Sequence, residues 1–221
     1  MSLQKTMLGR TLLGWCAAAL LATMATMAVS PVAAQEPKAP TTPDSKWVKP
    51  PDDVPKAQRG DRIRNIDFLF DALKVAPDDE SAKAIENRIW ALWLTSGSDT
   101  ADLLMMRVKL ASDAKNLDLA IRLLNTIIEI RPQYTEAWNR RATLYFLKKD
   151  YGNSLADLRQ VLAREPRHFG ALAGLGTIME ELGEEKQALE AFRRAQTVHP
   201  RLKGVAEQVK GLSDKIDGRD I

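Results

Sequence analysis

The chain has 221 residues, with 32 lysines and arginines against 29 aspartates and glutamates, and a formal net charge of +3. A charge this close to neutral does not predict binding to nucleic acid or to an anionic membrane. Cys16 is the only cysteine, so the sequence excludes a disulfide framework within the chain.

Residues 1–34 have the layout of a secretory signal peptide. Lys5 and Arg10 form a basic start, residues 11–29 form a 19-residue apolar run, and small residues follow at 32–34. We therefore expect export to the periplasm through the general secretory route, with cleavage after Ala34.

Cleavage would change the composition of the working protein. It removes Lys5 and Arg10, which lowers the net charge to +1 (3 − 2), and it removes Cys16. The mature chain then has no thiol. The alternative is an uncleaved anchor, because the apolar run is close to the roughly 20 residues that a helix needs to cross a bilayer. Only in that case would the chain contact the inner membrane.

Residues 35–60 are predicted to form a disordered, semi-extended spacer. The stretch is rich in proline, which lacks an amide donor and disfavours helix in the residue before it. Trp47 is the exception in this polar stretch: it either docks onto the folded body or a partner, or stays an unanchored exposed ring. The prolines are Pro37, Pro40, Pro43, Pro50, Pro51 and Pro55.

Beyond the spacer the sequence repeats with a fixed period. Three prolines keep this spacing, and each is expected to end the second helix of a repeat, since proline cannot donate to the helical ladder. They are Pro132, Pro166 and Pro200, which lie 34 apart in sequence number (166 − 132 and 200 − 166). The repeats are accordingly set at 101–134, 135–168 and 169–202.

Other positions keep the same register. The eighth and twentieth residues of each repeat are mostly small, which lets the two helices of a repeat approach closely. The twenty-fourth and twenty-seventh are apolar and are expected to fill the seam to the next repeat. In that order the residues are Val108, Ala142 and Gly176; Ala120, Ser154 and Ala188; Leu124, Leu158 and Phe192; and Ile127, Val161 and Ala195.

These repeats resemble the tetratricopeptide signature. The resemblance implies an all-α fold, a right-handed α-solenoid of antiparallel helix pairs over residues 61–221. The signature residues are Trp138, Ala142, Tyr145, Asp150, Tyr151, Leu155 and Pro166 in one repeat, and Leu172, Leu175, Gly176, Gly183, Ala188, Leu189, Phe192, Ala195 and Pro200 in the next.

Two further segments flank the repeats. Residues 65–98 fit either a fourth, degenerate repeat, with Phe68 at its fourth and Ala84 at its twentieth position, or a simple helical hairpin. Residues 203–217 place apolar side chains at helical spacing, which predicts an amphipathic helix that caps the last repeat.

Residues that could support catalysis are few. His168 and His199, the only histidines, lie beside terminating prolines, and a metal pair there is the one route to an enzyme that the sequence offers. With no cysteine left after the predicted cleavage and no second imidazole on the same helix, we interpret them as turn residues near helix ends. Gly170, Gly174 and Gly176 lack the spacing of a phosphate-binding loop. We predict no enzyme activity, no cofactor and no metal.

The resemblance also implies a binding groove on the concave face, which the first helix of each repeat lines. Three polar residues are expected to hold carboxylate or peptide carbonyl groups, two apolar residues to contact the ligand, and two threonines to complete the lining. An ordinary solvated helix residue is the alternative for each. In that order they are Lys109, Asn139 and Arg140; Met105 and Phe146; and Thr143 and Thr177.

One subtype of the family is excluded. Domains that clamp a chaperone's C-terminal carboxylates carry lysine, asparagine and arginine at set positions, and Met105, Gly170 and Gly174 stand at three of these.

The complete layout is similar to that of small periplasmic tetratricopeptide proteins of Gram-negative bacteria. This similarity implies a non-enzymatic scaffold that binds a protein or peptide, not nucleic acid, and supports assembly or integrity of the cell envelope. One alternative is an accessory factor of cytochrome maturation or secretion that presents client peptides. Another is self-association through the exposed end repeats.

Overall fold

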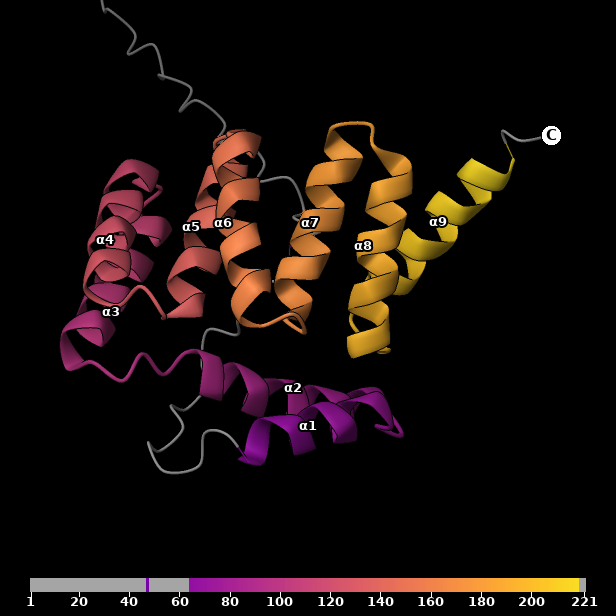
Figure 1. The fold of residues 1–221 in the computed structure, drawn as a ribbon, viewed down its shortest axis with the longest axis horizontal. Helices are drawn as coiled ribbons and strands as arrows, with labels where there is room; N and C mark the ends of the chain where they lie inside the picture. Colours follow the sequence, from indigo (N-terminus) through magenta and orange to yellow (C-terminus); the bar gives the residue numbers. More distant parts are fainter. Residues whose placement is uncertain (1–46, 48–63, 219–221) are drawn as a thin grey trace, which may run out of the picture. The chain divides into compact units, whose positions relative to one another are not determined.

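The computed structural model describes residue 47 and residues 64–218. These residues form nine α-helices and no strand, and α3 to α9 follow one another in chain order (Figure 1). The helices are α1 (Arg64–Lys74), α2 (Asp79–Trp93), α3 (Asp99–Asp113), α4 (Leu117–Ile130), α5 (Thr135–Leu147), α6 (Tyr151–Arg164), α7 (Phe169–Glu181), α8 (Glu185–Val198) and α9 (Val205–Asp217).

The three predicted repeats correspond to the pairs α3–α4, α5–α6 and α7–α8. Each pair packs closely within itself and touches the next, and α9 packs on α8 through Val205 and Leu212, which are buried. This arrangement confirms the predicted all-α repeat fold.

The small residues at positions eight and twenty allow the two helices of a repeat to approach closely. A Cβ added to Gly176 would lie 2.8 Å from the ring of Phe192, so only glycine fits there. In the preceding repeat, the Ser154 hydroxyl donates to the Ala142 carbonyl at 2.8 Å. All residues predicted at positions eight, twenty, twenty-four and twenty-seven are buried, which confirms the register.

The same tight turn joins the two helices of every repeat. Its central residue, the fifteenth of the repeat, has a positive φ: 59° at Lys115, 60° at Lys149 and 78° at Gly183. The amide of the next residue donates to a carbonyl five residues earlier, at 2.8–2.9 Å. Glycine adopts this left-handed conformation without strain, whereas the two lysines do not.

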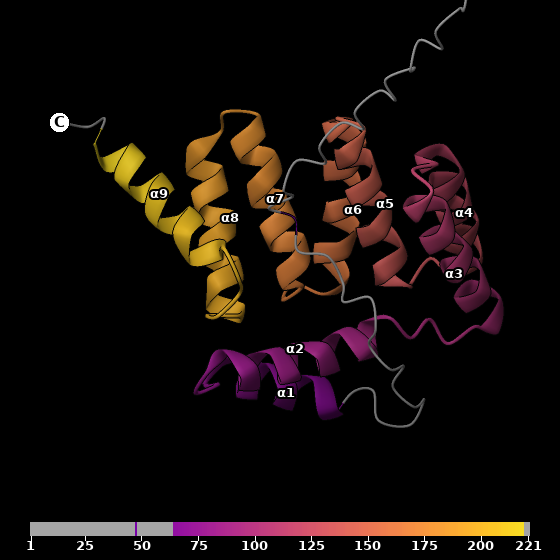
Figure 2. The same cartoon turned by 180° about the vertical axis from the view of Figure 1, so that it is seen from behind.

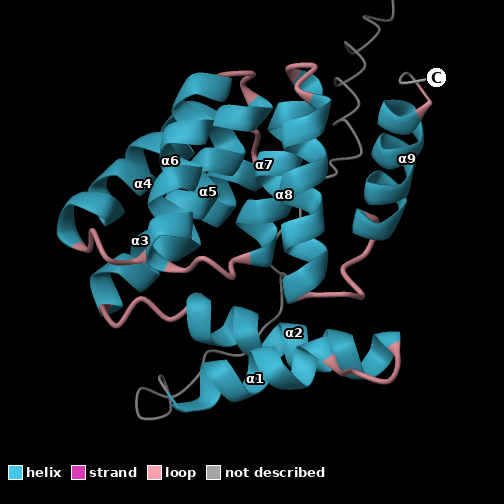
Figure 3. Ribbon diagram, turned by 45° about the vertical axis from the view of Figure 1, so that its right-hand side comes forward, coloured by secondary structure: helices cyan, strands magenta, loops and turns pink. Residues whose placement is uncertain are grey.

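The α1–α2 pair does not continue the stack as a fourth repeat. Ala84 would stand at position twenty, and it is exposed, whereas its counterparts Ala120, Ser154 and Ala188 are buried. The pair forms a hairpin that lies across one edge of the stack, where the inter-repeat turns are (Figures 1 and 3).

Two arginines that follow terminating prolines hold this hairpin. Arg167 stacks on Phe70, with its guanidinium carbon 4.2 Å from the ring centroid, and its Nη1 donates to Asp67 at 2.7 Å. Arg201, at the equivalent position of the next repeat, donates to two carbonyl oxygens in the α1–α2 turn at 3.1 and 2.6 Å. The periodic sequence therefore provides equivalent attachment points along the edge.

The first inter-repeat turn also holds the segment that leaves α2. The hydroxyl of Tyr134 donates to the Leu94 carbonyl at 3.0 Å, and Arg131 donates to the Ser96 carbonyl at 3.1 Å. Contacts to the hairpin and its exit thus come from three successive turns of the stack.

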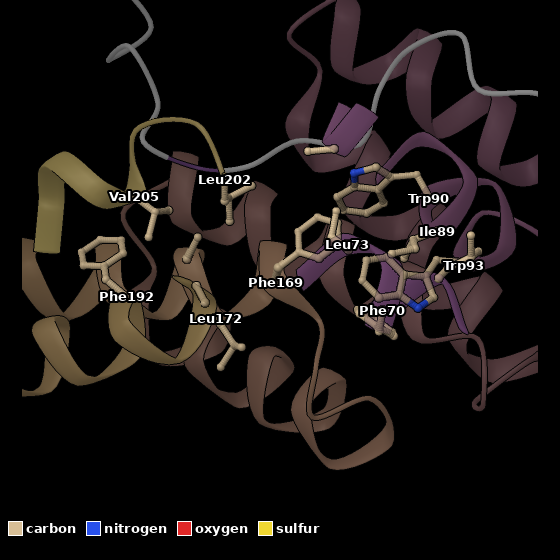
Figure 4. Close-up of a cluster of buried hydrophobic side chains, with 14 of the residues drawn as sticks. Phe70, Leu73, Ile89, Trp90, Trp93, Phe169, Leu172, Phe192, Leu202 and Val205 are labelled. Carbon is tan, nitrogen blue, oxygen red and sulfur yellow. The ribbon is translucent and has the colours of Figure 1, made fainter. Parts of the chain in front are cut away.

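Aromatic rings form the centre of this contact (Figure 4). Trp93 stacks on His168 with ring centroids 4.0 Å apart and an interplanar angle of 6°. Phe169 packs against Trp90 and Trp93 at 5.4 and 5.0 Å. His168, Trp90 and Phe169 are fully buried, so these rings form one core with α7 and α8.

Glu86 is a buried carboxylate at the same contact. It accepts hydrogen bonds from Lys83 at 2.8 Å, from the indole of Trp90 at 3.2 Å and from Nε2 of His199 at 3.2 Å. Burial raises the pKa of Glu86, but the hydrogen bonds from His199 and Lys83 and the charge of Lys83 outweigh burial, so the pKa falls below its ordinary value.

We predict that Gly183→Ala lowers the free energy of unfolding by about 1 kcal/mol, because alanine is strained at a φ of +78°. No side chain lies within 4 Å of the added Cβ, so the effect comes from the backbone alone. Gly211→Ala, in the middle of α9 and equally unobstructed, is the control and should raise it by about 0.5–1 kcal/mol. Urea unfolding measures the free energy of unfolding of both variants. Equal changes in Gly183→Ala and Gly211→Ala would contradict the turn assignment.

A second prediction concerns pH. Because the pKa of Glu86 is lower in the folded than in the unfolded state, its stabilisation is complete above the ordinary glutamate pKa and is lost as the pH falls through the folded value. Glu86→Gln should therefore cost about 1–3 kcal/mol at pH 7 and less near pH 3. Urea titrations at both pH values measure this, with exposed Glu80→Gln as control. A difference in free energy of unfolding between the unmodified chain and Glu86→Gln that stays constant with pH would contradict this prediction.

Candidate peptide-binding face

The first helices of the repeats, α3, α5 and α7, line the face on which the predicted groove residues lie. Because α5 and α7 touch, the structure brings the α5 and α7 candidates together. Of the two candidates from α3, Met105 is buried in an apolar cluster that also holds side chains of α4 and α5, and Lys109 is exposed and pairs with Asp113 at 3.2 Å.

Trp47, from the predicted spacer, docks on this face against α5 and α7. Figure 2 shows these two helices from behind. Its side chain is only 3% exposed, and its ring centroid lies 5.2 Å from that of Phe146 on α5. Of the two alternatives that the sequence left open for Trp47, docking onto the folded body is the one observed. The apolar cluster that receives it also contains Ala142, Ala171 and Ile178.

A glycine on α7 makes room for the indole. A Cβ added to Gly174 would lie 2.7 Å from two ring carbons of Trp47, closer than any real contact. The indole N–H of Trp47 is buried and meets no acceptor among the described residues. Shape and aromatic contact, rather than a hydrogen bond, therefore hold the ring. We call the surface of α5 and α7 that Trp47 contacts, formed by Phe146 and Gly174, the indole seat.

A polar group centred on Glu136 lies on the same helix as Phe146, about three turns earlier. Glu136 is fully buried, and its carboxylate accepts from Arg140 at 3.1 Å and from the Asn139 amide at 3.0 Å. Nε2 of buried His168 lies 3.6 Å from the same carboxylate. The guanidinium of Arg140 offsets the cost of burying this charge. Arg140 thus uses its Nε, and Asn139 its side-chain amide, to satisfy Glu136.

The threonines of the predicted groove bond within their own helices. The Thr143 hydroxyl donates to the Asn139 carbonyl at 3.0 Å, and that of Thr177 to the Ala173 carbonyl at 3.1 Å. Thr177, Asn139 and Phe146 are buried, whereas Arg140 and Thr143 keep part of their surface exposed.

Arg141 fixes the position of α5, which supplies four of the groove candidates. Its Nε and Nη2 donate to the carboxylate of Asp157 on α6, both at 2.7 Å, and Nη1 donates to Asn125 on α4 at 2.7 Å. The hydrogen bond with Asp157 raises the pKa of Arg141, against the effect of burial. The α5–α6 repeat, which supplies Phe146 to the indole seat, is thereby tied to the repeat before it.

Sequence reasoning missed Glu136 as part of this face, and it did not identify the role of Gly174 there. Gly174 had a visible signal, since it is a glycine inside a predicted helix at a position that normally points into the groove. The structure gives its physical reason: the residue is small because Trp47 lies over it. Glu136 had no signal, because its burial depends on the folded surroundings.

The two histidines lie in different surroundings. His168 caps α7, its Nδ1 accepting from the Ala171 amide at 3.1 Å, and His199 faces Glu86. Among the residues that the structure describes, no three His, Cys, Asp or Glu side chains gather as a metal site would require. None of the helices in that part of the chain is long and apolar enough to span a membrane. The apolar run at 11–29 and the cleavage site lie outside it.

Comparisons with known proteins support the family. A family profile described as "Tetratricopeptide repeat" matches residues 150–201. A TPR repeat-containing protein of Rhizobium etli is 39% identical over 155 residues, which cover 70% of this chain and 76% of that protein.

Solved structures with similar folds include the TPR domain of Arabidopsis OM64, at a TM-score of 0.48 and 20% identity over 51% of this chain and 93% of that one. The MamA RS-1 ArsTM double mutant matches at 0.49 and 17% identity over 72% and 88%. Taken with the helix pairs and their periodic register, the match to the Rhizobium protein shows that this chain belongs to the tetratricopeptide repeat family of protein-interaction scaffolds.

Proposed function

We propose that the protein is a non-enzymatic scaffold of the periplasm that binds a protein or peptide on the α5–α7 face and supports assembly or integrity of the cell envelope. The signal-like residues 1–34 support the location. Membership of a family of protein-interaction scaffolds supports the class of activity.

One observation carries the proposal: the α5–α7 face already binds a residue from outside the helical stack. Trp47 belongs to none of the helices, yet the face buries it almost completely. A surface that accepts a single side chain in this way has the property that peptide binding requires, namely an apolar seat for an anchor residue.

Polar groups beside the seat suit a peptide backbone. Arg140 keeps 23% of its side chain exposed, and Thr143 is also partly exposed one turn further along α5. These groups border the seat on the same helix, so a peptide anchored there would run past them.

We predict that p-benzoylphenylalanine at Thr143, introduced in living cells, forms crosslinks to a distinct partner protein on irradiation. The reason is that Thr143 is a partly exposed residue of α5, between the polar group and the indole seat. Mass spectrometry of the crosslinked band identifies the partner.

The matched control carries the same photoreactive residue at Arg159, an exposed residue of α6, the second helix of that repeat. The same partner captured equally from both positions, or none from Thr143, would count against the α5–α7 face as the binding surface.

A further prediction tests the location. The mature protein should begin at Gln35 and be released with the periplasmic fraction on osmotic shock, because small residues at 32–34 suit signal peptidase. N-terminal sequencing and fractionation measure this. Retention of residues 1–34 with sedimentation in the membrane fraction would show an anchored protein instead.

A further inference from the structure

From the contacts of Trp47 we infer that the indole seat is a recognition site for a tryptophan in an extended segment of a partner protein, with Trp47 as a built-in competitor. This inference rests on the proposed function and adds the class of ligand and a mode of regulation. It concerns the described residues of the seat and Trp47 itself.

The seat matches an indole in shape. The position of Gly174 removes the one Cβ that would meet the ring, at 2.7 Å, and Phe146 provides an aromatic wall at 5.2 Å. Tyr151 extends that wall, with its ring 6.0 Å from that of Phe146. Aromatic pairs in this distance range attract each other beyond their buried area. A smaller side chain would leave the space over Gly174 unfilled.

Trp47 has the properties of a ligand rather than those of a core residue. It lies outside every helix, and its ring nitrogen donates to no acceptor in the described part of the chain. The helix pairs beneath it are held by contacts of their own, such as the Ser154 to Ala142 bond and the pairing of Arg141 with Asp157. Release of Trp47 therefore leaves these contacts between the helices intact.

The tether determines who can displace Trp47. Sixteen residues join it to α1, and a ligand on a tether of this order acts at an effective concentration in the millimolar range. A second copy of the chain at micromolar concentration, offering the same tryptophan, cannot compete with this higher effective concentration. A partner that adds contacts beyond the seat, with Thr143 and Arg140 for example, binds tightly enough to displace Trp47. The occupant is thus a tryptophan-bearing segment of another protein.

Competition of this kind has a measurable size. If Trp47 occupies the seat in 90–99% of molecules, a competing peptide binds roughly ten- to a hundred-fold more weakly than it would to an empty seat. Removal of Trp47 should restore that affinity.

The test uses the mature chain, residues 35–221, and a fluorescein-labelled peptide with the sequence of residues 42–51, which contains the tryptophan of position 47. Fluorescence anisotropy should show binding to Trp47→Ala at least about tenfold tighter than to the unmodified chain. The same peptide with alanine in place of its tryptophan should not bind. Trp47→Ala combined with Gly174→Leu should also not bind, because the leucine fills the emptied seat.

Circular dichroism and urea unfolding establish that each variant is folded. A folded Trp47→Ala chain that binds the peptide no better than the unmodified chain would overturn the inference and make Trp47 a permanent part of the core. Dimers of the unmodified chain that disappear with Trp47→Ala, detected by analytical ultracentrifugation, would overturn it in favour of exchange between copies.

A second measurement covers the case in which Trp47→Ala does not fold. In the chain labelled with 5-fluorotryptophan, millimolar unlabelled peptide should move the Trp47 resonance toward the position of an exposed indole. An unchanged resonance refutes displacement. Crosslinking at Thr143 is independent of these results, so failure of the seat and failure of the scaffold role can be told apart.

Discussion

Trp93 lies flat on His168 at 4.0 Å, and Phe169 packs against both Trp90 and Trp93. These contacts join parts of the chain that are 75 positions apart (168 − 93) and bury rings that would otherwise face water. Because the rings interlock at the start of α7, the hairpin cannot slide along the edge of the stack without exposing them. The same contact positions α7, which carries Gly174, so the shape of the indole seat depends on an aromatic core that lies outside it.

The α5–α7 face combines two kinds of burial on α5, about three turns apart. The Glu136 carboxylate is tolerated there because Arg140 and Asn139 satisfy it, and an unpaired charge in the same place would be strongly destabilising. Phe146, further along the helix, makes the face apolar where Trp47 docks. A ligand that replaces Trp47 therefore meets a dry seat at one end and a neutralised ion pair at the other. Specificity on such a face comes from the fit of one anchor, with the polar groups orienting the backbone beside it.

The repeat register predicted α3 to α8 well because it follows from local rules: a small residue where helices approach, a proline where a helix ends, a tight turn between. Those rules recur in each repeat and are visible in Gly176 and Pro166 alike. The hairpin was not predictable in the same way. Phe68 and Ala84 fit repeat positions by residue type, yet both are exposed, since docking is decided by non-periodic residues such as Trp93. The sequence predicted the indole seat only in part. Trp47 and Gly174 each stood out in the sequence, but only the fold reveals that they are in contact.

Attachment of the hairpin and its exit segment to Tyr134, Arg167 and Arg201 gives the stack a fixed length. Solenoid families change size by gaining or losing whole repeats, since each unit needs only its neighbours. Here, α1 and α2 span only about 16 and 22 Å at 1.5 Å per residue for 11 and 15 residues, and contacts from three successive turns converge on them and on the residues that follow α2. An extra unit inserted before α7 would draw those turns apart and leave the hairpin attached to only some of them. The number of repeats is therefore fixed by the hairpin. A change in repeat number, ordinarily tolerated in this architecture, would here destabilise the fold.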